Sequence, residues 1–600
     1  MPPMSRLMSR NDLAFLLHDW LGVTSLTSRD RYVDHDRGTF DAVLQLAEEV
    51  ATRHFAPHNR RNDAEEPTFD GETVHMHPEV RVALDVLAGT GLIGSSADVE
   101  LGGMQLPHVV ATAAAAWFQA ANIGTWSYAL LTVANANLLM AHGSTQQVDT
   151  WVRPMLEGRF HGTMCLSEPQ AGSSLADITT RAVKQEDGSY RLTGTKMWIS
   201  GGDHDLGENI VHLVLARTPD APPGVRGISL FLVPKFLLSD DGSIGERNDV
   251  VLAGLNHKMG YRGTTNTVLN FGEGRHTPGG RTGAVGTMVG AEGQGLAAMF
   301  HMMNEARIAI GAGAAALGYT GYLKSVDYAR TRTQGRPLGA KDPSQPPVAL
   351  DQHPDVRRML LAQKSYVEGA LAVVLFCSRL VDEQLTGETA ESRHRASLLL
   401  EILTPIAKSW PSQWCLAAND LAIQVHGGYG YTREYDVEQH YRDNRLNPIH
   451  EGTHGIQGLD LLGRKVSMHN GAAFTALCEL IEATLSRARG GAPHLQELAG
   501  AVGDTLGQLV DVTSVLLDEP DAQVRLANSS LYLEAVGHLV VGWAWLDQLL
   551  ALGEREDGFA AAKRAAARYF CRYELPDART RLRLLETLDR TTVDLDPSVL

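Results

Sequence analysis

The stretch Asn447-Pro448-Ile449-His450-Glu451-Gly452-Thr453 places one carboxylate in a short run that carries no other acid. Apolar residues with helical spacing follow it, at Ile456, Leu459, Leu462 and Val466. Taken alone, an acid in a Gly/Thr turn before a helix is most often a helix cap or a solvated charge. Two segments far upstream decide between that interpretation and a catalytic one.

The first upstream segment is Met164-Cys165-Leu166-Ser167-Glu168-Pro169-Gln170-Ala171-Gly172-Ser173, and the second is Lys196-Met197-Trp198-Ile199-Ser200. Together with the stretch around Glu451 they resemble the acyl-CoA dehydrogenase family. In that family the two upstream segments cradle a flavin, and the late Glu is the catalytic base. The resemblance covers residues 36–466 and implies an FAD-dependent enzyme that converts an acyl-CoA thioester to the trans-2-enoyl-CoA.

The composition is that of an ordinary globular protein, with 20% charged and 44% hydrophobic residues among 600. This length predicts several packed units. The net charge of −17 opposes a general affinity for nucleic acid or anionic membranes, so no nucleic-acid partner is expected. Five cysteines without a C-x-x-C pair fit a reducing compartment. With no secretory signal visible, these features predict a cytoplasmic protein.

Three sequence patterns could suggest a membrane span, a metal site or a dinucleotide site, but each is better explained by a structural role. The apolar stretch 531–552 contains Glu534, His538 and Asp547, which predicts a buried helix and no integral membrane segment. No metal site is expected, because the histidines near residue 426 have no acid or cysteine at ligand spacing. The run 311–316 matches G-x-G-x-x-A inside a helical pattern, which indicates close helix packing instead of a dinucleotide site.

The hydrophobic period changes along the chain and predicts five parts. They are an N-terminal extension (1–35), an N-terminal helical domain (36–162), a small β-barrel domain on the flavin side (163–275), a four-helix bundle with the catalytic Glu (276–468) and an extra C-terminal helical domain (469–600). The predicted fold class is therefore α+β, mainly α, and acyl-CoA dehydrogenase-like. The two terminal additions resemble a large bacterial branch of the family, which acts on medium or long acyl-CoAs or on 3-methylthiopropanoyl-CoA.

The implied reaction needs a carboxylate at the α-carbon, donors on the thioester oxygen and a hydride acceptor at the β-carbon. By resemblance, Glu451 is the base and its backbone N–H binds the thioester oxygen together with a flavin hydroxyl. A dry pocket would raise the pKa of that carboxylate towards the working pH. Gly452 leaves room for the thioester. His450 and Gly455 depart from the family pattern at the mouth of the pocket.

The resemblance also assigns residues to the substrate. They are Ser173, Asn304, Arg307 and Gly452. Some family members carry the base at the position that Ala306 occupies here. Glu305 lies one position away and is predicted to be a solvated or ion-paired helix residue, and Glu168 is predicted to shape its loop.

The residues assigned to FAD form two sets. One set holds the ring and its surroundings and comprises Met164, Leu166, Ser167, Gly172, Ser173, Trp198, Ile199, Ser200 and Thr453. The other resembles residues that reach the FAD of a neighbouring subunit, which implies a homodimer, and comprises Arg332, Gln334, Gln424, Gly427 and Gly428. Backbone N–H groups and small hydroxyls suit oxidised flavin, whose edge atoms are mostly acceptors.

Other activities on this fold remain open at this point. A specific 3-methylthiopropanoyl-CoA dehydrogenase is one, and an acyl-CoA oxidase that passes electrons to O2 is another. A flavin monooxygenase would normally lack the base, and a non-catalytic DNA-associated protein would need a basic surface. For a dehydrogenase, the expected electron acceptor is an electron-transfer flavoprotein.

Overall fold

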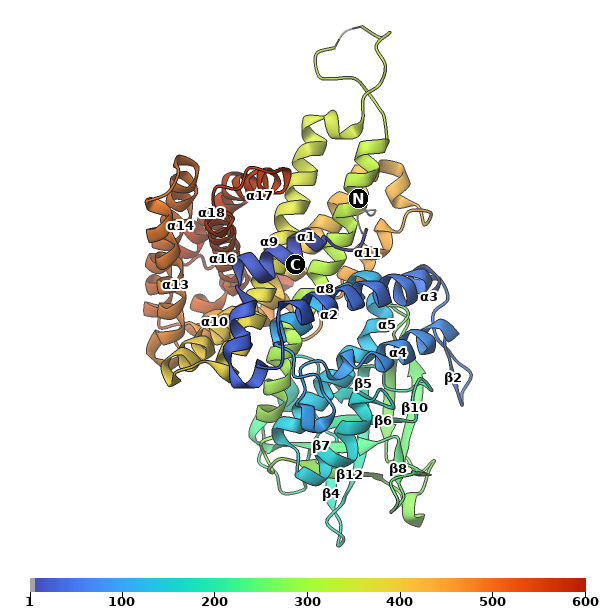
Figure 1. Ribbon diagram of the computed structural model, residues 1–600. Helices are drawn as coiled ribbons and strands as arrows, with labels where there is room; N and C mark the ends of the chain where they lie inside the picture. The colour runs from blue at the N-terminus through green and yellow to red at the C-terminus, as the bar shows by residue number, and fades with distance from the viewer. Residues whose placement is uncertain (1–5, 341) are drawn as a thin grey trace. The chain divides into compact units, whose positions relative to one another are not determined.

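The computed structural model describes residues 6–340 and 342–600, with the main chain alone for residues 300–304. The chain divides into two compact units. Unit 1 comprises Met1–Phe40, Pro107–Ala120 and Arg307–Leu600, and unit 2 comprises Asp41–Leu106 and Ala121–Ala306. Two long helices, α5 (His108–His142) and α8 (Gly295–Thr331), pass from one unit to the other along the chain (Figure 1).

Unit 2 contains an eight-stranded sheet in the order β10-β11-β5-β12-β7-β6-β3, with β4 pairing both β5 and β6. The pairings β4–β5, β5–β12, β12–β7, β7–β6 and β6–β4 close a ring, so the predicted small barrel is confirmed. The strands are β3 (Phe160–Cys165), β4 (Arg181–Lys184), β5 (Tyr190–Ser200), β6 (Asn209–Arg217), β7 (Ile228–Pro234), β10 (Val250–Leu255), β11 (Asn266–Phe271) and β12 (Ala284–Val289). Two-stranded pairs join β1 (Thr68–Phe69) to β2 (Val74–His75) and β8 (Phe236–Leu238) to β9 (Ile244–Arg247).

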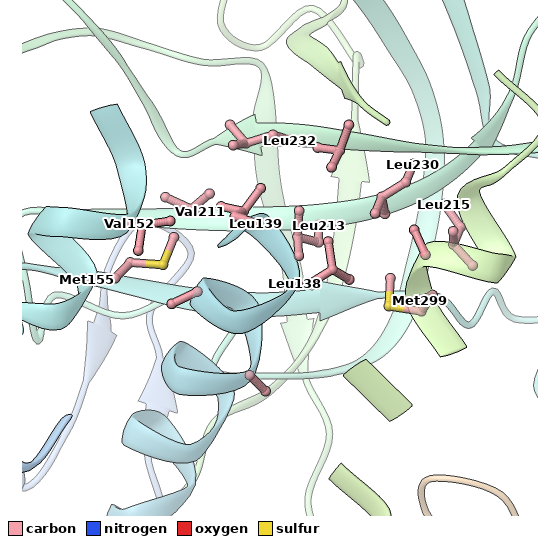
Figure 2. Close-up of a cluster of buried hydrophobic side chains, with 14 of the residues drawn as sticks. Leu138, Leu139, Val152, Met155, Val211, Leu213, Leu215, Leu230, Leu232 and Met299 are labelled. Carbon is pink, nitrogen blue, oxygen red and sulfur yellow. The ribbon is translucent and has the colours of Figure 1, made fainter. Parts of the chain in front are cut away.

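The barrel core explains why these segments are strands. Eight of the nine residues of β6 are buried, and most of them are apolar, which is typical of a strand covered on both faces. Figure 2 shows Leu213 of β6 and Leu230 of β7 facing Leu138 and Leu139 of α5 in one cluster. The other helices of this part of the chain are α2 (Arg37–Val50), α3 (Asn59–Ala64), α4 (Pro78–Gly89), α6 (Thr145–Gln147) and α7 (Arg153–Leu156).

The helical bundle of unit 1 is built on α9 (Pro354–Thr386) and α10 (Ala390–His426), which pack along one another. Close helix packing at the G-x-G-x-x-A run is confirmed, because a Cβ on Gly311 would lie 2.0 Å from the carbonyl oxygen of Ala407. After α10 come α11 (Val437–Asn444), α12 (His454–Asp460) and its π-helical continuation η14 (Leu461–Lys465). The turn between α11 and α12 contains Glu451.

Additional helices complete unit 1. They are α1 (Arg10–Ala14) with its continuation η1 (Phe15–Trp20), α13 (Ala472–Arg489), α14 (Pro493–Asp518), α15 (Ala522–Leu526), α16 (Ser529–Leu552), α17 (Gly558–Tyr569), η16 (Phe570–Glu574), α18 (Leu575–Glu586) and α19 (Thr591–Asp594). The predicted order of helical, β and helical segments, followed by further helices, is therefore confirmed. Both α9 and α16 are long and apolar enough to cross a bilayer, but 78% and 83% of their most apolar windows are buried inside the protein. Such burial is typical of core helices.

A cluster of buried charges ties the two ends of the chain to the bundle. We call Asp12, Tyr319, Lys364, Glu368 and Lys563 the terminal charge cluster. Lys563 of α17 pairs with Asp12 of α1 and, at 3.0 Å, with Glu368 of α9. The hydroxyl of Tyr319 donates to Asp12 at 3.0 Å, and Lys364 pairs with Glu368. Each buried charge thus has an oppositely charged neighbour, which such burial requires.

Candidate active site

The turn that carries Glu451 has an uncommon backbone conformation. Both Glu451 (φ 52°) and Gly452 (φ 85°) lie in the left-handed region. A non-glycine residue there costs about 1–3 kcal/mol and persists only where its surroundings hold it. At φ 85° any other side chain would be strained at Gly452, and its Cβ would also lie 2.6 Å from Nε2 of Gln457, so the position favours glycine. Thr453 ends the turn as the N-cap of α12, accepting from the N–H of Ile456 at 3.3 Å.

Donors from neighbouring elements hold the carbonyl groups of this turn. Nε2 of Gln457 donates to the carbonyl oxygen of Glu451 at 2.9 Å, and Nζ of Lys408 donates to that of Gly452 at 2.7 Å. The N–H of His454 reaches the carbonyl oxygen of Pro448 at 3.0 Å. Within the described parts of the chain, no hydrogen bond or ion pair involves the carboxylate or the backbone N–H of Glu451. Both groups remain available to a bound molecule.

The electrostatics of the turn favour a carboxylate that can take up a proton. Burial raises the pKa of Glu451, while the positive charges of Lys408 and Arg307 oppose that rise. Lys408 is fully buried in α10. Burial lowers the pKa of Lys408 to about 7, although the charge of Glu451 acts in the opposite direction. The charges of Glu451 and Lys408 therefore each favour the ionised form of the other.

Arg307, whose charge acts on Glu451, forms an ion pair with α12. Its side chain is buried, and its Nη1 lies 2.9 Å from Oδ2 of Asp460 at the end of α12. The other carboxylate oxygen of Asp460 contacts Nε of Arg464 at 2.8 Å. The positive charge of Arg307 therefore acts on Glu451, and its ion pair anchors α12 to α8. The side chain of Asn304, the neighbouring substrate prediction, lies outside the described residues.

A chain of amides connects the turn to α10. Oδ1 of Asn447 lies 3.0 Å from Nε2 of His450, and Nδ2 of Asn447 donates to Asn444 at 2.8 Å. Asn444 in turn donates to Oδ1 of Asn419 at 2.7 Å. Burial, reinforced by the charge of Lys408, lowers the pKa of His450 to about 3, so this imidazole is neutral. His450 thus supports the turn without adding charge to it.

In unit 2, the loop after β3 is held by a buried ion pair. Lys196 of β5 lies 3.0 Å from Glu168 and also donates to the carbonyl oxygen of Leu166 at 3.0 Å. The N–H of Met197 donates to the carbonyl oxygen of Ser167 at 3.0 Å. Glu168 therefore shapes this loop, as predicted. In the described chain, the hydroxyl and N–H of Ser167 make no hydrogen bond.

Trp198 occupies a β-bulge that turns its side chain outward. In the β5–β11 pairing, Thr267 faces Ile199 and Val268 faces Met197, so Trp198 has no partner across the ladder. Its φ is 66° and its side chain is 58% exposed. Such bulges often redirect a side chain next to a functional site. An exposed indole beside the unused donors of Ser167 fits a flavin ring, whose edge atoms are mostly acceptors.

The other residues of unit 2 that were predicted to bind FAD differ in how far they are buried. Gly172 and Ser173 are exposed in the loop after Glu168, whereas Met164 is half-buried in β3. Ile199 is buried in the barrel core, so only its main chain can face a ligand. Oγ of Ser200 accepts from Nδ2 of Asn266 at 3.3 Å.

The second predicted FAD set gathers at one end of unit 1. The guanidinium of Arg332 lies 5.6 Å from the ring centre of Tyr429, the residue after Gly428. Gly427 ends α10 with φ 62° and has open space at its Cβ position. Gln334 and Gln424 are also exposed. Across the described residues, no hydrogen bond, ion pair or ring contact joins Arg332 to the turn at Glu451.

The motifs did not reveal three residues that shape the candidate site: Lys408, Gln457 and Asp460. Lys408 could have been noticed, because it is the only charged residue between Glu401 and Asp420 in an otherwise apolar helical run. Gln457 and Asp460 carry no local signal. Glu305, the acid near the alternative base position, accepts from Nδ2 of Asn137 at 2.7 Å.

Comparison with known proteins supplies a family context. Models of the acyl-CoA dehydrogenase N-terminal, middle and C-terminal domains match residues 39–159, 163–273 and 293–466. A model described as acetyl-CoA dehydrogenase C-terminal like matches residues 477–596. The 3-methylmercaptopropionyl-CoA dehydrogenase of Ruegeria pomeroyi is 37% identical, over 93% of this chain and 94% of the relative. The broad-specificity linear acyl-CoA dehydrogenase FadE5 of Mycobacterium tuberculosis is 32% identical, over 98% of both chains.

Solved structures share the fold across nearly the whole chain. Caenorhabditis elegans ACDH-11 in complex with C11-CoA has a TM-score of 0.76 at 19% identity, covering 97% of this chain and 95% of that one. A Bacillus anthracis acyl-CoA dehydrogenase complexed with FAD has a TM-score of 0.75 at 18% identity, covering 94% and 90%. The likeness includes the additional C-terminal helices.

Proposed function

The chain belongs to the acyl-CoA dehydrogenase family of flavin-dependent oxidoreductases, and on that premise we propose that Glu451 is the base that removes the α-proton of an acyl-CoA. The product is the trans-2-enoyl-CoA, and the cofactor is FAD. One observation carries the assignment of Glu451. Its carboxylate is unpaired among the described residues, on a strained turn whose carbonyl oxygens at Glu451 and Gly452 accept from donors behind it.

The surroundings of Glu451 suit a general base. A base works best when its pKa lies near the working pH, and burial moves the pKa of this carboxylate upward. The positive charge of Lys408 opposes that rise and so favours the ionised carboxylate, the form that accepts a proton.

The backbone of the turn supplies a second function. Gln457 and Lys408 hold the carbonyl oxygens of Glu451 and Gly452. The N–H of Glu451 makes no hydrogen bond among the described residues, so it is available for the thioester oxygen. A donor fixed in advance stabilises the negative charge that develops on that oxygen as the α-proton leaves. The missing side chain at Gly452 keeps the approach open.

The residues of unit 2 support FAD binding. We assign the N–H and hydroxyl of Ser167 to the acceptor edge of the ring and the exposed indole of Trp198 to its face. When bound, FAD supplies the acceptor for the hydride that leaves the β-carbon. Arg332, with the exposed backbone at Gly427 and Gly428, suits a pyrophosphate, since a guanidinium can form two charge-assisted bonds.

The substrate proposal follows the relatives. The 37% identical relative is a 3-methylmercaptopropionyl-CoA dehydrogenase, and the 32% identical one is a broad-specificity linear acyl-CoA dehydrogenase. We therefore assign linear acyl-CoAs as the substrate class, with 3-methylthiopropanoyl-CoA as the second candidate. We further assign a homodimer, an electron-transfer flavoprotein as acceptor and a cytoplasmic location.

A substrate panel tests this function. FAD-loaded enzyme is mixed anaerobically with linear acyl-CoAs of increasing length and with 3-methylthiopropanoyl-CoA, and the loss of flavin absorbance is followed. Rapid bleaching by at least one acyl-CoA is expected, with the enoyl-CoA as product. Bleaching by none of them would contradict the proposal, and rapid reoxidation by O2 with peroxide formation would indicate an oxidase.

A further inference from the structure

A continuous hydrogen-bonded chain links the extra C-terminal helices to the turn that carries Glu451. Nε of Arg581 on α18 lies 2.7 Å from Oε2 of Glu534 on α16. Oε1 of the same Glu534 lies 3.2 Å from Nε2 of His454, the first residue of α12. Nδ1 of His454 lies 2.6 Å from Oγ of Ser409 on α10. This series of hydrogen bonds therefore connects four helices, α18, α16, α12 and α10.

The proton positions along this chain follow from its chemistry. Burial alone would raise the pKa of Glu534, but hydrogen bonds from His454 and Arg581 outweigh it and leave that pKa below its ordinary value. An ionised carboxylate can only accept, so Nε2 of His454 carries the hydrogen of this bond. Nδ1 can then accept the hydroxyl hydrogen of Ser409. Both nitrogens are engaged, which fixes the orientation of the imidazole.

His454 is directly connected to the strained turn. It follows Thr453, the N-cap of α12, and its own N–H bonds to the carbonyl oxygen of Pro448 at the start of the turn. The helix α12 also packs tightly on the start of α16, since a Cβ on Gly458 would lie 2.8 Å from the carbonyl carbon of Ser529. The imidazole and the backbone of α12 therefore both rest on the C-terminal helices.

We propose that Glu534 is a positioning residue for the base, so that the extra C-terminal helices complete the catalytic turn through His454. The inference rests on the proposed role of Glu451. A turn with two consecutive left-handed residues keeps its geometry only when its surroundings determine it. A displacement of about 1 Å can cost a reaction roughly 100-fold, so an anchor of this kind is felt at the α-carbon.

The order Ser409, His454 and Glu534 is also that of a nucleophilic triad, but its setting excludes that role. Ser409 is fully buried within α10, so a substrate carbon cannot reach its hydroxyl. A nucleophile needs an exposed oxygen beside oxyanion donors. The three side chains therefore act on the position of α12.

The test isolates proton abstraction from the later steps. An acyl-CoA that has α-deuterium but no hydrogen on its β-carbon can lose deuterium to water through Glu451 and cannot proceed further. The exchange rate per bound FAD is measured for the full-length, FAD-loaded parent and for Glu534→Ala and Glu534→Gln. Melting temperature and KM for an oxidisable acyl-CoA are recorded in parallel. Glu497→Ala is the matched control, because Glu497 forms an exposed pair with Arg572 elsewhere in the C-terminal helices.

Glu534→Ala should lower the exchange rate roughly 10- to 100-fold at saturating substrate, with KM and FAD content nearly unchanged. Glu534→Gln keeps an oxygen that accepts from His454 and should recover most of the rate. Glu497→Ala should match the parent. His454→Asn and Ser409→Ala, which break the chain elsewhere, should show losses of the same kind.

Two results would overturn the proposal. The first is a rate of α-deuterium exchange per bound FAD that equals the parent's in both Glu534→Ala and His454→Asn. The other is a loss that follows melting temperature and FAD content and is not recovered in Glu534→Gln, since this describes a purely structural contact. Exchange that survives in Glu451→Gln would instead contradict the proposed function and leave the anchoring of α12 to be judged from the remaining variants.

Discussion

The ammonium of Lys408 donates to the carbonyl oxygen of Gly452 at 2.7 Å, and its charge acts on the carboxylate of Glu451 one residue away. This one side chain therefore holds the backbone of the turn and lowers the proton affinity of Glu451, the proposed base.

Replacing Lys408 should shift the pH dependence of the reaction. Without the ammonium, the pKa of Glu451 should rise further, because burial would then be opposed by Arg307 alone. The base would be protonated at a higher pH, so Lys408→Met should move the acidic limb of the rate profile upward. The groups near Lys408 are Glu451, Arg307 and His450. Flavin reduction measured from about pH 5.5 to 9 checks this shift, and an unchanged profile would contradict it.

Replacing Glu451, the proposed base, should strongly slow proton abstraction. Glu451→Gln keeps the volume but removes the basicity, and losing a general base typically costs roughly 10²–10⁴-fold. Flavin reduction and α-deuterium exchange should both fall by about that factor while FAD binding survives. Glu305→Gln is the matched control and should retain most activity, since its acid is bonded to Asn137. The opposite result in the two variants would move the assignment to α8.

The exposed indole of Trp198 should contribute to FAD affinity. Aromatic stacking contributes about 0.5–1.5 kcal/mol beyond buried area, so Trp198→Ala should raise the Kd for FAD up to about 10-fold. Trp198→Phe should retain most of the affinity. Val183→Ala removes another exposed apolar side chain of the same barrel and should have no effect. Fluorescence titration of apoprotein with FAD measures all three, and equal affinities would remove Trp198 from the site.

Arg332 should contribute to FAD retention through the proposed dimer. A hydrogen bond to a charged group is worth about 1.5–3 kcal/mol, so Arg332→Ala should weaken FAD binding by roughly 10- to 100-fold. The fold should be unaffected, because the side chain is exposed. Arg330→Ala, an exposed arginine two residues earlier, is the control. FAD retained after gel filtration, together with the mass of the assembly, checks both the contact and the dimer.

The Glu168–Lys196 pair should make the β domain sensitive to acid. Burial alone would raise the pKa of Glu168, but Lys196 and the bonds from Thr179 and Thr180 outweigh it and lower that pKa to about 2, from an ordinary 4.5. The pair therefore contributes stability above about pH 4.5, and this contribution is lost as the pH falls towards 2. Denaturant unfolding across this range measures the change.

Breaking the same pair should destabilise the protein at neutral pH. Glu168→Gln leaves the ammonium of Lys196 buried without a carboxylate, which typically costs about 3–5 kcal/mol. Adding Lys196→Met removes the orphaned charge and should recover part of this loss. Equal stability of the single variant and the parent would show that the pair does not hold the loop.

The sequence was sufficient to predict the fold class and the residue proposed as the base. The segments at Leu166, Trp198 and Glu451 are local motifs, and the alternating and helical periods lie in separate parts of the chain. The bulge at Trp198 was not predictable from alternation, because a bulge interrupts the period on which strand prediction depends.

Residues that act on the turn from other helices could not be predicted. Lys408 and Glu534 lie 43 positions before and 83 positions after Glu451, so the numbering places them far away while helix packing brings them to the same turn. A lone lysine in an apolar helix signals burial but does not identify its partner. The ion pair of Asp460 could not be predicted either, because its partner Arg307 precedes it by more than a hundred residues.

The terminal charge cluster makes the two ends of the chain interdependent. Lys563 near the end pairs with Asp12 near the start and with Glu368 inside the bundle, and Lys364 supplies the second positive charge. Removing α13 and all that follows it would take away Lys563 and leave the carboxyl groups of Asp12 and Glu368 with Lys364 as the only remaining cation of this cluster. Trimming α1 would remove an anion and unbalance the remaining side chains. A shortened enzyme of minimal family size could therefore not be cut from this sequence without rewriting its core, and in evolution the two additions would have to be gained or lost together.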